Sequence, residues 1–229
     1  MKRILITGGS GGIGRATVQR LLDLGYAVVN LDVTPWEAGH PNYHFVKVDI
    51  GQQSDLDQVL ADLPYIDGLI NNAVLSNNGP FLSQSMKELT NALDVNIVAP
   101  VRLSQWFANQ YDGNTGRIVN ISSTRARMSE ADTIPYTLSK GAIEALTHSL
   151  AITLAPKRIT VNAIAPGWIH HSGPKPSASD QTFHPSGRVG RPDDIARTIA
   201  FLLDEASQFI TGEIITIDGG VTKKMIYPE

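Results

Sequence analysis

The sequence predicts a single α/β domain with a doubly wound, mostly parallel sheet of seven strands and helices on both faces. Short apolar runs alternate with longer segments of helical periodicity along the whole chain, as such sheets require. A glycine-rich turn follows the first apolar run directly, and polar residues follow most of the later runs. With 229 residues, of which 42% are hydrophobic, the chain is long enough for one such domain over residues 1–229.

Composition excludes several classes of function. The net charge of −3 and the pI near 6.1 give no indication of a nucleic-acid or anionic-membrane partner. Without cysteine, the chain can form neither disulfides nor thiolate sites. The apolar run before Gly8 is too short for a signal peptide, and no run approaches the ~20 residues of a membrane span. We therefore expect a cytoplasmic protein.

The first strand, helix and second strand form a dinucleotide-binding pattern. A strand at residues 4–6 leads into the glycine-rich segment 7–14, a helix then runs to a stop at Gly25, and a strand at 26–31 ends at Asp32. Glycines let a pyrophosphate approach the backbone, and the helix N-terminus offers free N–H groups. The alternative is a glycine-rich turn without a ligand, but the complete order of elements favours a Rossmann-type cofactor site.

Asp32 indicates which dinucleotide would bind. Its carboxylate can accept hydrogen bonds from a ribose diol, whereas it would repel a 2′-phosphate. The glycine loop itself has no lysine or arginine before Gly12 for such a phosphate, although Arg15 follows the loop by one residue. We therefore expect NAD(H) rather than NADP(H).

Polar residues also follow the third and fourth predicted strands, at the sheet edge where ligands bind. The strand at 43–48 ends at Asp49, which would either meet the adenine or cap the helix at 54–63. The strand at 66–70 is followed by Asn-Asn-Ala at 71–73, where the asparagines would either approach the cofactor or serve as structural turn residues. The sequence leaves both choices open.

A long helical pattern at residues 85–109 contains Pro100. Proline has no N–H for the carbonyl four residues earlier, which belongs to Asn96. The pattern therefore predicts a kink and an Asn96 carbonyl without its helical partner. From this helix alone, a solvent-facing asparagine at a tolerated kink is the favoured interpretation.

A candidate proton-transfer site lies between the next strand and helix. The strand at 117–121 precedes Ser123, and the helix at 135–155 places Tyr136 and Lys140 one turn apart on one face. A phenol titrates near pH ~10 in water, and a nearby ammonium favours its ionised form. Taken alone, a core tyrosine beside a lysine that extends to solvent is the default interpretation.

The remaining elements complete the sheet. A strand at 159–164 is followed by an irregular segment at 168–190, which we interpret as a substrate loop or lid. A helix at 192–203 and a strand at 212–218 end the pattern. The helix at 135–155 is apolar around most of its circumference, so we expect it to pack on a partner subunit as well as on the sheet.

Several short motifs occur in one order along the chain: Thr7-Gly-x-x-x-Gly12-x-Gly14, Asp32, Asp49, Asn71-Asn72-Ala73, Asn96, Ser123, Tyr136-x-x-x-Lys140, Pro166-Gly167 and Gly190-Arg-Pro192. With this order and spacing, the chain resembles the short-chain dehydrogenase/reductase family over essentially its whole length. The glycine spacing is similar to that of the single-domain oxidoreductase subgroup rather than the longer epimerase-like subgroup.

The resemblance implies a role for each motif. Tyr136 would be the general acid/base, and Ser123 would hold the substrate oxygen. Lys140 would bind the nicotinamide ribose and favour the phenolate, and the main-chain carbonyl of Asn96 would hold a water of a proton relay. Such enzymes usually form tetramers or dimers through two helices, here those at 85–109 and 135–155. The implied cofactor-binding residues are Thr7, Gly8, Ser10, Gly12, Ile13, Gly14, Asp32, Asp49, Ile50, Asn72, Ala73, Tyr136, Lys140, Pro166, Gly167 and Ile169.

The chain departs from the family pattern near the substrate. Val74 stands where a glycine is usual, His171 stands where a threonine commonly touches the nicotinamide, and the segment from there to Pro192 is short. His170, His171 and His184 could suggest a metal, but with no cysteine and a proline-rich loop between them we expect none. A substrate contact by His171 or His184 and a solvated loop histidine are the other interpretations.

We expect an NAD(H)-dependent enzyme that interconverts a secondary alcohol and a ketone by hydride transfer. Its substrate is a small molecule that the sequence does not name. A reductase of 3-oxoacyl thioesters is the first alternative, although such relatives usually favour NADPH. A non-catalytic dinucleotide sensor or scaffold is the second, and it would have no use for the serine, tyrosine, lysine and asparagine set.

Overall fold

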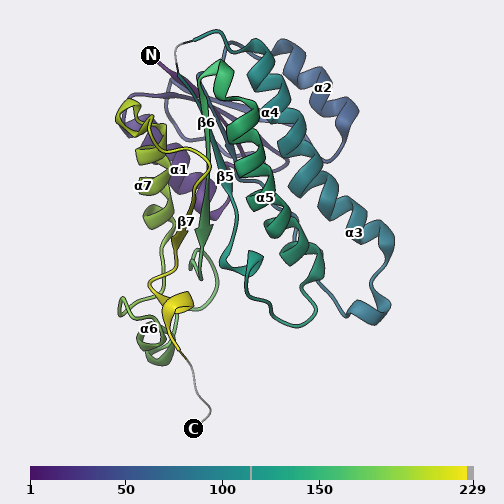
Figure 1. Ribbon diagram of the computed structural model, residues 1–229, viewed down its shortest axis with the longest axis vertical. Coiled ribbons are helices and arrows are strands. Elements are labelled where there is room, and N and C mark those ends of the chain that lie inside the picture. Colours follow the sequence, from purple (N-terminus) through teal and green to yellow (C-terminus); the bar gives the residue numbers. More distant parts are fainter. Residues whose placement is uncertain (114, 226–229) are drawn as a thin grey trace.

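The computed structural model, which describes residues 1–113 and 115–225, contains a seven-stranded sheet in the order β3-β2-β1-β4-β5-β6-β7 (Figure 1). Every strand pair is parallel, so the predicted fold class is confirmed. Of the predicted domain at 1–229, Asn114 and residues 226–229 lie outside the described residues. The strands are β1 (Arg3–Thr7), β2 (Ala27–Asp32), β3 (Tyr43–Lys47), β4 (Gly68–Asn71), β5 (Gly116–Ile121), β6 (Ile159–Pro166) and β7 (Ile214–Ile217).

Helices cover both faces of this sheet. In Figure 1, α1 and α7 lie together on one face, α2, α4 and α5 lie on the other, and α6 lies beyond the carboxyl ends of the strands. No helix in the described ranges is long and apolar enough to cross a membrane. The helices are α1 (Gly12–Asp23), α2 (Gln53–Asp62), α3 (Met86–Leu93), α4 (Ala99–Gln110), α5 (Ile134–Thr153), α6 (Ala178–Phe183) and α7 (Pro192–Leu203).

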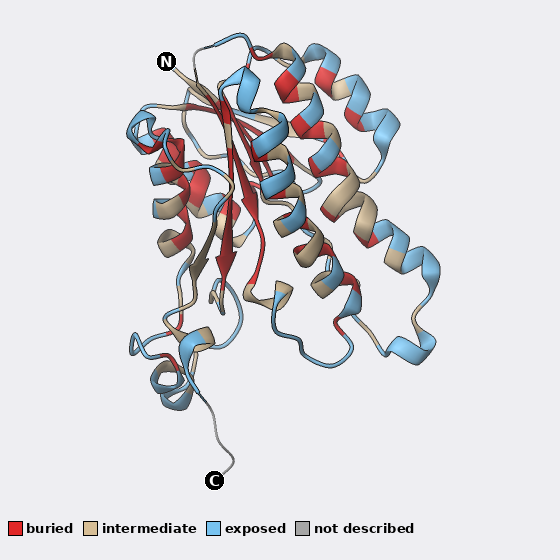
Figure 2. Ribbon diagram, viewed as in Figure 1, coloured by how far each residue is buried: buried red, intermediate tan, exposed pale blue. Residues whose placement is uncertain are grey.

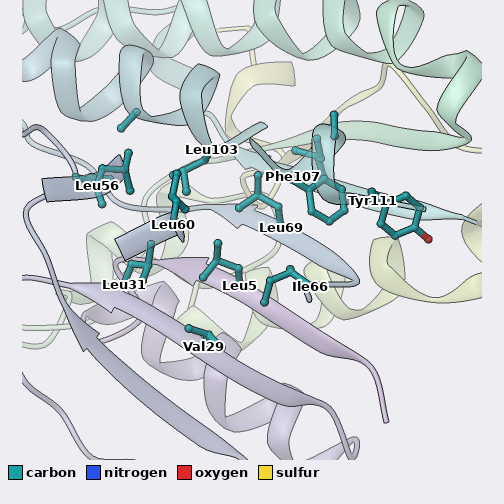
Figure 3. Close-up of a cluster of buried hydrophobic side chains, with 14 of the residues drawn as sticks. Leu5, Val29, Leu31, Leu56, Leu60, Ile66, Leu69, Leu103, Phe107 and Tyr111 are labelled. Carbon is teal, nitrogen blue, oxygen red and sulfur yellow. The ribbon is translucent and has the colours of Figure 1, made fainter. Parts of the chain in front are cut away.

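Two apolar clusters lie on opposite faces of the sheet, because alternate residues of a strand point to opposite sides. On one face, Leu5 and Leu69 of the central strands pack with Phe107 of α4 (Figure 3). On the other face, Ile6 of β1 packs with Ile199 of α7 and with α1. Figure 2 shows the central strands buried along their length. Both faces are covered, so these strands are near-continuous apolar runs.

The strand order reverses at β1, which pairs with β2 on one side and with β4 on the other. Crossover connections therefore leave β1 and β4 in opposite directions. In such sheets, a crevice opens between the loops that follow these two strands, and ligands bind there. Here the two loops begin at Gly8 and Asn72.

The helical pattern at 85–109 forms one continuous helical path, in which a π-helical turn separates α3 from α4. A π-helical turn, Asp94–Val98, lies between α3 and α4, and in it the N–H of Ala99 donates to the carbonyl oxygen of Asp94. Such turns occur mostly as single insertions within α-helices, frequently at functional sites. Pro100 explains where this π-helical turn lies, because proline has no N–H group to donate to the carbonyl oxygen of Asn96 four residues earlier.

The segment at 168–190 is more regular than predicted. It contains α6, whose first turn is capped by Ser177: its hydroxyl oxygen accepts from the N–H of Asp180 at 3.2 Å. A helix of fewer than two turns leaves no recognisable periodicity in a sequence. The prediction of an irregular loop was therefore wrong for residues 178–183.

Candidate active site

A cavity of about 1390 Å³ occupies the carboxyl end of the sheet, at the crevice beside β1. It is large enough for a dinucleotide and a small substrate together. All the residues predicted to be catalytic or to bind the cofactor line this cavity, except Thr7 and Asn96. These two lie behind its wall, where they hold other parts in place.

The glycine loop folds tightly against itself and against the end of β4. A Cβ atom at Gly14 would lie 2.1 Å from the carbonyl oxygen of Gly8, and one at Gly8 would lie 2.8 Å from the Cα of Ala73. Gly8 also has a positive φ of 69°, which favours glycine. Substituting either glycine would therefore displace the backbone on which a pyrophosphate would rest.

Thr7 and Asn72 join the two loops of the crevice. The hydroxyl oxygen of Thr7 accepts from the N–H groups of Asn72 and Ala73, at 3.1 and 3.0 Å. The side-chain amide of Asn72 donates back to the carbonyl oxygens of Thr7 and Gly8, both at 3.0 Å. Asn72 thus has a structural role and also lines the cavity, so the two alternatives for it are compatible.

Asn30 of β2 supports the glycine loop, although none of the motifs in the sequence includes it. This fully buried residue of β2 accepts the N–H of Gly9 at 2.8 Å and donates to the hydroxyl of Ser10 at 3.1 Å. Its amide also donates to the phenol oxygen of Tyr43 at 2.9 Å. The signal was present, because Asn30 is the one polar residue in the run from Ala27 to Leu31.

Asp32 lies at the end of β2 and faces the cavity. One carboxylate oxygen accepts the N–H of Ser10 at 3.0 Å, and the other accepts that of Thr34 at 2.9 Å. The cation beside this region, Arg15, donates to the carbonyl oxygen of Ser10 at 3.0 Å, and its guanidinium carbon lies 4.8 Å from the centre of the Trp36 ring. A carboxylate thus lies on the wall of the cavity at the end of β2.

The N-terminus of α1 fits an anion. No acidic side chain lies in its first turn, and its N-cap, Gly11, makes no side-chain hydrogen bond. Its backbone N–H groups are therefore available, and the helix dipole favours negative charge there. The ring of His171 lies over this turn, since a Cβ atom at Gly12 would approach it to 2.9 Å. Together, the loop, the helix end and Asp32 fit a dinucleotide.

Lys140 and Tyr136 point into the same cavity from the first turns of α5. The ammonium of Lys140 is buried, donates to the carbonyl oxygen of Ile121 at 2.8 Å, and lies 5.5 Å from the centre of the Tyr136 ring. Burial lowers the pKa of Lys140 from its ordinary value of 10.5 to about 8. The phenol and the ammonium are thus neighbours, as the one-turn spacing predicts.

Ser123 and Ser122 have different surroundings. The hydroxyl of Ser122 donates to the carbonyl oxygen of Lys140 at 3.2 Å and to Glu144 at 3.3 Å, so it ties β5 to α5. The hydroxyl of Ser123 instead accepts the N–H of Arg125 at 3.2 Å and keeps its proton available. This arrangement supports the choice of Ser123 as the serine that would contact a substrate.

Asn96 is buried, so the solvent-facing interpretation is wrong. Its side chain accepts the N–H of Leu75 at 2.8 Å and donates to the Leu75 carbonyl oxygen at 2.9 Å. It also donates to the hydroxyl of Ser139 at 3.1 Å, and that hydroxyl donates to the carbonyl oxygen of Tyr136 at 2.8 Å. The π-helical turn is thereby joined to the loop after β4 and to the first turn of α5.

The segment at 168–190 forms one wall of the cavity. Trp168, Phe183 and His184 line it, and the buried His184 has its Nδ1 2.8 Å from the carbonyl oxygen of Asp180. Hydrogen bonds from Arg188 to Asp194, at 2.7 and 2.6 Å, fasten the segment to α7 and lower the pKa of that carboxyl group. Among the described residues, no three His, Cys, Asp or Glu side chains gather closely enough to hold a metal.

Comparison with known proteins agrees with this geometry. Residues 8–222 match the family described as enoyl-(acyl carrier protein) reductase. An uncharacterized oxidoreductase of Thermotoga maritima is 37% identical, over 100% of this chain and 98% of its own length.

Solved structures of similar proteins have the same fold. An apo SCOR enzyme from Clostridium thermocellum has a TM-score of 0.90 at 37% identity, covering 99% of this chain and 96% of its own. A 4-hydroxyisoleucine dehydrogenase complexed with NADH has a TM-score of 0.91 at 29% identity, covering 98% and 100%. This chain therefore belongs to the short-chain dehydrogenase/reductase family of NAD(P)-dependent oxidoreductases.

Proposed function

We propose that the protein interconverts a secondary alcohol and a ketone with NAD(H). One observation carries the proposal: Ser123, Tyr136 and Lys140 line the same cavity as the glycine loop. A hydroxyl, a phenol and an ammonium are therefore available beside a dinucleotide site. Cytoplasmic location, expected from the composition, stays a prediction.

The chain's own groups position the substrate and move its proton. When bound, the dinucleotide supplies or accepts the hydride. The hydroxyl of Ser123 holds the substrate oxygen, and Tyr136 gives that oxygen a proton or removes one. Lys140 places its charge beside the phenol, 5.5 Å from the centre of the Tyr136 ring, and binds the ribose beside the nicotinamide. Asn96 holds a water with its main-chain carbonyl and so links Lys140 to solvent.

The preference for NAD(H) rests on Asp32. Its carboxylate lines the cavity, and the nearby Arg15 already contacts Ser10 and Trp36. A 2′-phosphate would meet the negative charge of Asp32. The similar 4-hydroxyisoleucine dehydrogenase binds NADH, which supports the proposal. Side-by-side fluorescence titrations with NADH and NADPH test it, and tighter binding of NADPH would overturn it.

Tyr136→Phe tests the reaction. Wild-type protein is first screened with NAD⁺ against sugars, polyols, steroids and hydroxy acids by the absorbance of NADH. On any substrate found, the variant should lose about 10²–10⁴-fold in turnover, because the proton-transfer group is gone. Its affinity for NADH should change little. Tyr65→Phe, ahead of β4 at the other end of the sheet, is the control. A Tyr136→Phe enzyme that turns over like wild type would refute the assignment.

A reductase of 3-oxoacyl thioesters is the second candidate, because the matching family is described as an acyl-carrier-protein reductase. Preference for NADPH together with turnover of a 3-oxoacyl thioester would favour it. If no compound of the panel gives an NADH signal while NADH binds, the non-catalytic sensor becomes the better explanation.

We also propose that the protein forms a homotetramer or homodimer through the α3–α4 region and α5. The buried face of α5 carries polar residues such as Ser139 and Thr147, whereas Leu138 and Ile152 are 50% and 78% exposed. On neighbouring α4, Val101 is also exposed. An outer face more apolar than usual is what a subunit contact would cover.

A further inference from the structure

Arg125 places a positive charge at the substrate end of the cavity. We propose that Arg125 binds a carboxylate of the substrate, so that the enzyme acts on secondary hydroxy acids and the corresponding oxo acids. This inference rests on the proposed function, since it names the substrate class for the same site.

The position of Arg125 relative to the candidate reacting groups is the first argument. Its backbone N–H donates to the hydroxyl oxygen of Ser123 at 3.2 Å. Its guanidinium carbon lies 5.8 Å from the centre of the Tyr136 ring, and the side chain lines the cavity. A substrate whose reacting oxygen lies between Ser123 and Tyr136 could therefore contact Arg125 with a group only a few carbon atoms away from that oxygen.

The charges around the cavity are the second argument. Among the described lining residues, Arg125 and Lys140 are the only arginine and lysine. Lys140 is buried and donates to the main-chain oxygen of Ile121, beside the predicted ribose site. Arg125 is therefore the permanent cation that a substrate would meet. The lining carboxylates are Asp32, Asp49, Asp94, Glu130 and Asp218.

The contacts of two of these carboxylates explain why Arg125 remains able to bind a substrate carboxylate. Asp218 accepts the N–H groups of Gly220 and Thr222 at 2.8 and 2.7 Å, so its charge is satisfied within its own turn. Glu130 forms an ion pair with Arg125, but the Glu130 side chain is 67% exposed. Ion pairs at the surface contribute little free energy to stability. A substrate carboxylate inside the cavity can replace Glu130, because guanidinium binds carboxylates with two parallel hydrogen bonds.

The other side chains at the substrate end of the cavity are largely apolar and suit the carbon skeleton of a substrate. Met128, Trp168 and Phe183 line it, and the aromatic ring of Phe183 packs edge-on against that of His184 at 5.9 Å. These side chains can contact the apolar part of a substrate while Arg125 holds its charged end. A hydroxy acid with a short apolar chain satisfies both features.

Matched pairs of probes test the inference. The acids 2-hydroxybutanoate, 3-hydroxybutanoate and 4-hydroxypentanoate place a carboxylate at increasing distances from a secondary alcohol, and their methyl esters remove the charge. Oxidation with NAD⁺ is measured for each acid and ester, and the ratio of kcat/KM for acid over ester is the readout. The variants are Arg125→Gln, Glu130→Gln and, as control, Arg127→Gln. Arg127 lies on the same loop, pairs with Glu144 at 3.1 Å and does not line the cavity.

We expect wild type to prefer at least one acid over its ester. In Arg125→Gln this ratio should fall about 10- to 100-fold, the usual effect of losing a charged hydrogen bond. In Glu130→Gln it should rise up to about fivefold, because the competing carboxylate is gone. Arg127→Gln should keep the wild-type ratio. No preference for any acid, or equal ratios in wild type and Arg125→Gln, would overturn the inference while leaving the proposed function intact.

A binding measurement covers the case in which no probe is oxidised. Calorimetry then measures 4-oxopentanoate and its methyl ester against the protein with NADH present. Binding of the acid that is lost in Arg125→Gln would support the carboxylate site although the proposed function had failed. Equal binding of acid and ester, or binding that Arg125→Gln leaves unchanged, would reject the site.

Discussion

Lys140 shows how a single residue is placed at some cost to stability. Its ammonium is buried and its pKa is lowered to about 8 by that burial. Below pH 8 the folded protein therefore holds a charge that water no longer solvates. Between pH 8 and about 10.5, the unfolded chain keeps the proton that the folded protein has lost. The free energy of unfolding contributed by Lys140 thus rises with pH in this window, by about 3 kcal/mol in all.

Replacing Lys140 by methionine should remove this pH dependence. Relative to wild type, Lys140→Met should be most stable below pH 8, and its relative stability should fall by about 3 kcal/mol between pH 8 and 10.5. Urea unfolding of both proteins across this range measures the difference. Lys87→Met, on the exposed side of α3, controls for the loss of one positive charge. Parallel curves for Lys140→Met and wild type would contradict the prediction.

At the scale of elements, the glycine loop and the start of α1 depend on space at particular glycines. A Cβ atom at Gly14 would meet backbone atoms of Gly8 and Gly9, whereas one at Gly11 would meet nothing within 4 Å. Gly11 therefore tolerates a side chain, whereas Gly14, three residues later in the chain, does not. The loop's sequence pattern alone does not distinguish them.

Gly14→Ala should destabilise the protein by about 3 kcal/mol, because the loop must shift to admit a methyl group. Gly11→Ala, in the same loop, should stay within about 1 kcal/mol of wild type, the usual difference between these residues at an N-cap. Urea unfolding without cofactor compares the two, so that binding does not contribute. Similar losses in both variants would show that the packing of Gly14 is not the limiting feature.

The π-helical turn is the second element that the site depends on. Asn96 there bonds to Leu75 in the loop after β4 and to Ser139 on α5. The helical pattern at 85–109 predicted an unusual carbonyl at this position because Pro100 follows by four residues. It could not predict that the side chain turns inward, since its partners are distant in the sequence.

At the scale of the whole molecule, the outer face of α5 predicts self-association. Leu138→Glu should weaken this contact, because a charge would be buried against an apolar partner surface. Sedimentation velocity should then show a shift from the assembled form towards the monomer. Leu24→Glu is a matched control, since Leu24 is also exposed but lies at the end of α1 on the other face of the sheet. An unchanged mass for Leu138→Glu would place the contact elsewhere.

Much of the fold was predictable because its signals are local. Most strands are apolar runs and each long helix has its own period, so the alternation of strands and helices along the chain can be recognised from neighbouring residues, and this alternation favours a parallel sheet. The glycine loop, Asp32 and the Tyr136–Lys140 spacing are local as well. The short helix α6 escaped prediction, since its six residues are too few to show a period.

By itself, the sequence determined the class of sheet, the position of the glycine loop and the candidate residues Ser123, Tyr136 and Lys140. Only the tertiary structure decided that Asn30 supports the loop and that Arg125 lies over the Tyr136 ring. The physical reason is the same in both cases. Periodicity and spacing indicate which residues share a helix or strand. The surroundings of a side chain instead depend on segments distant in the sequence, which come into contact only when the helices pack on the two faces of the sheet.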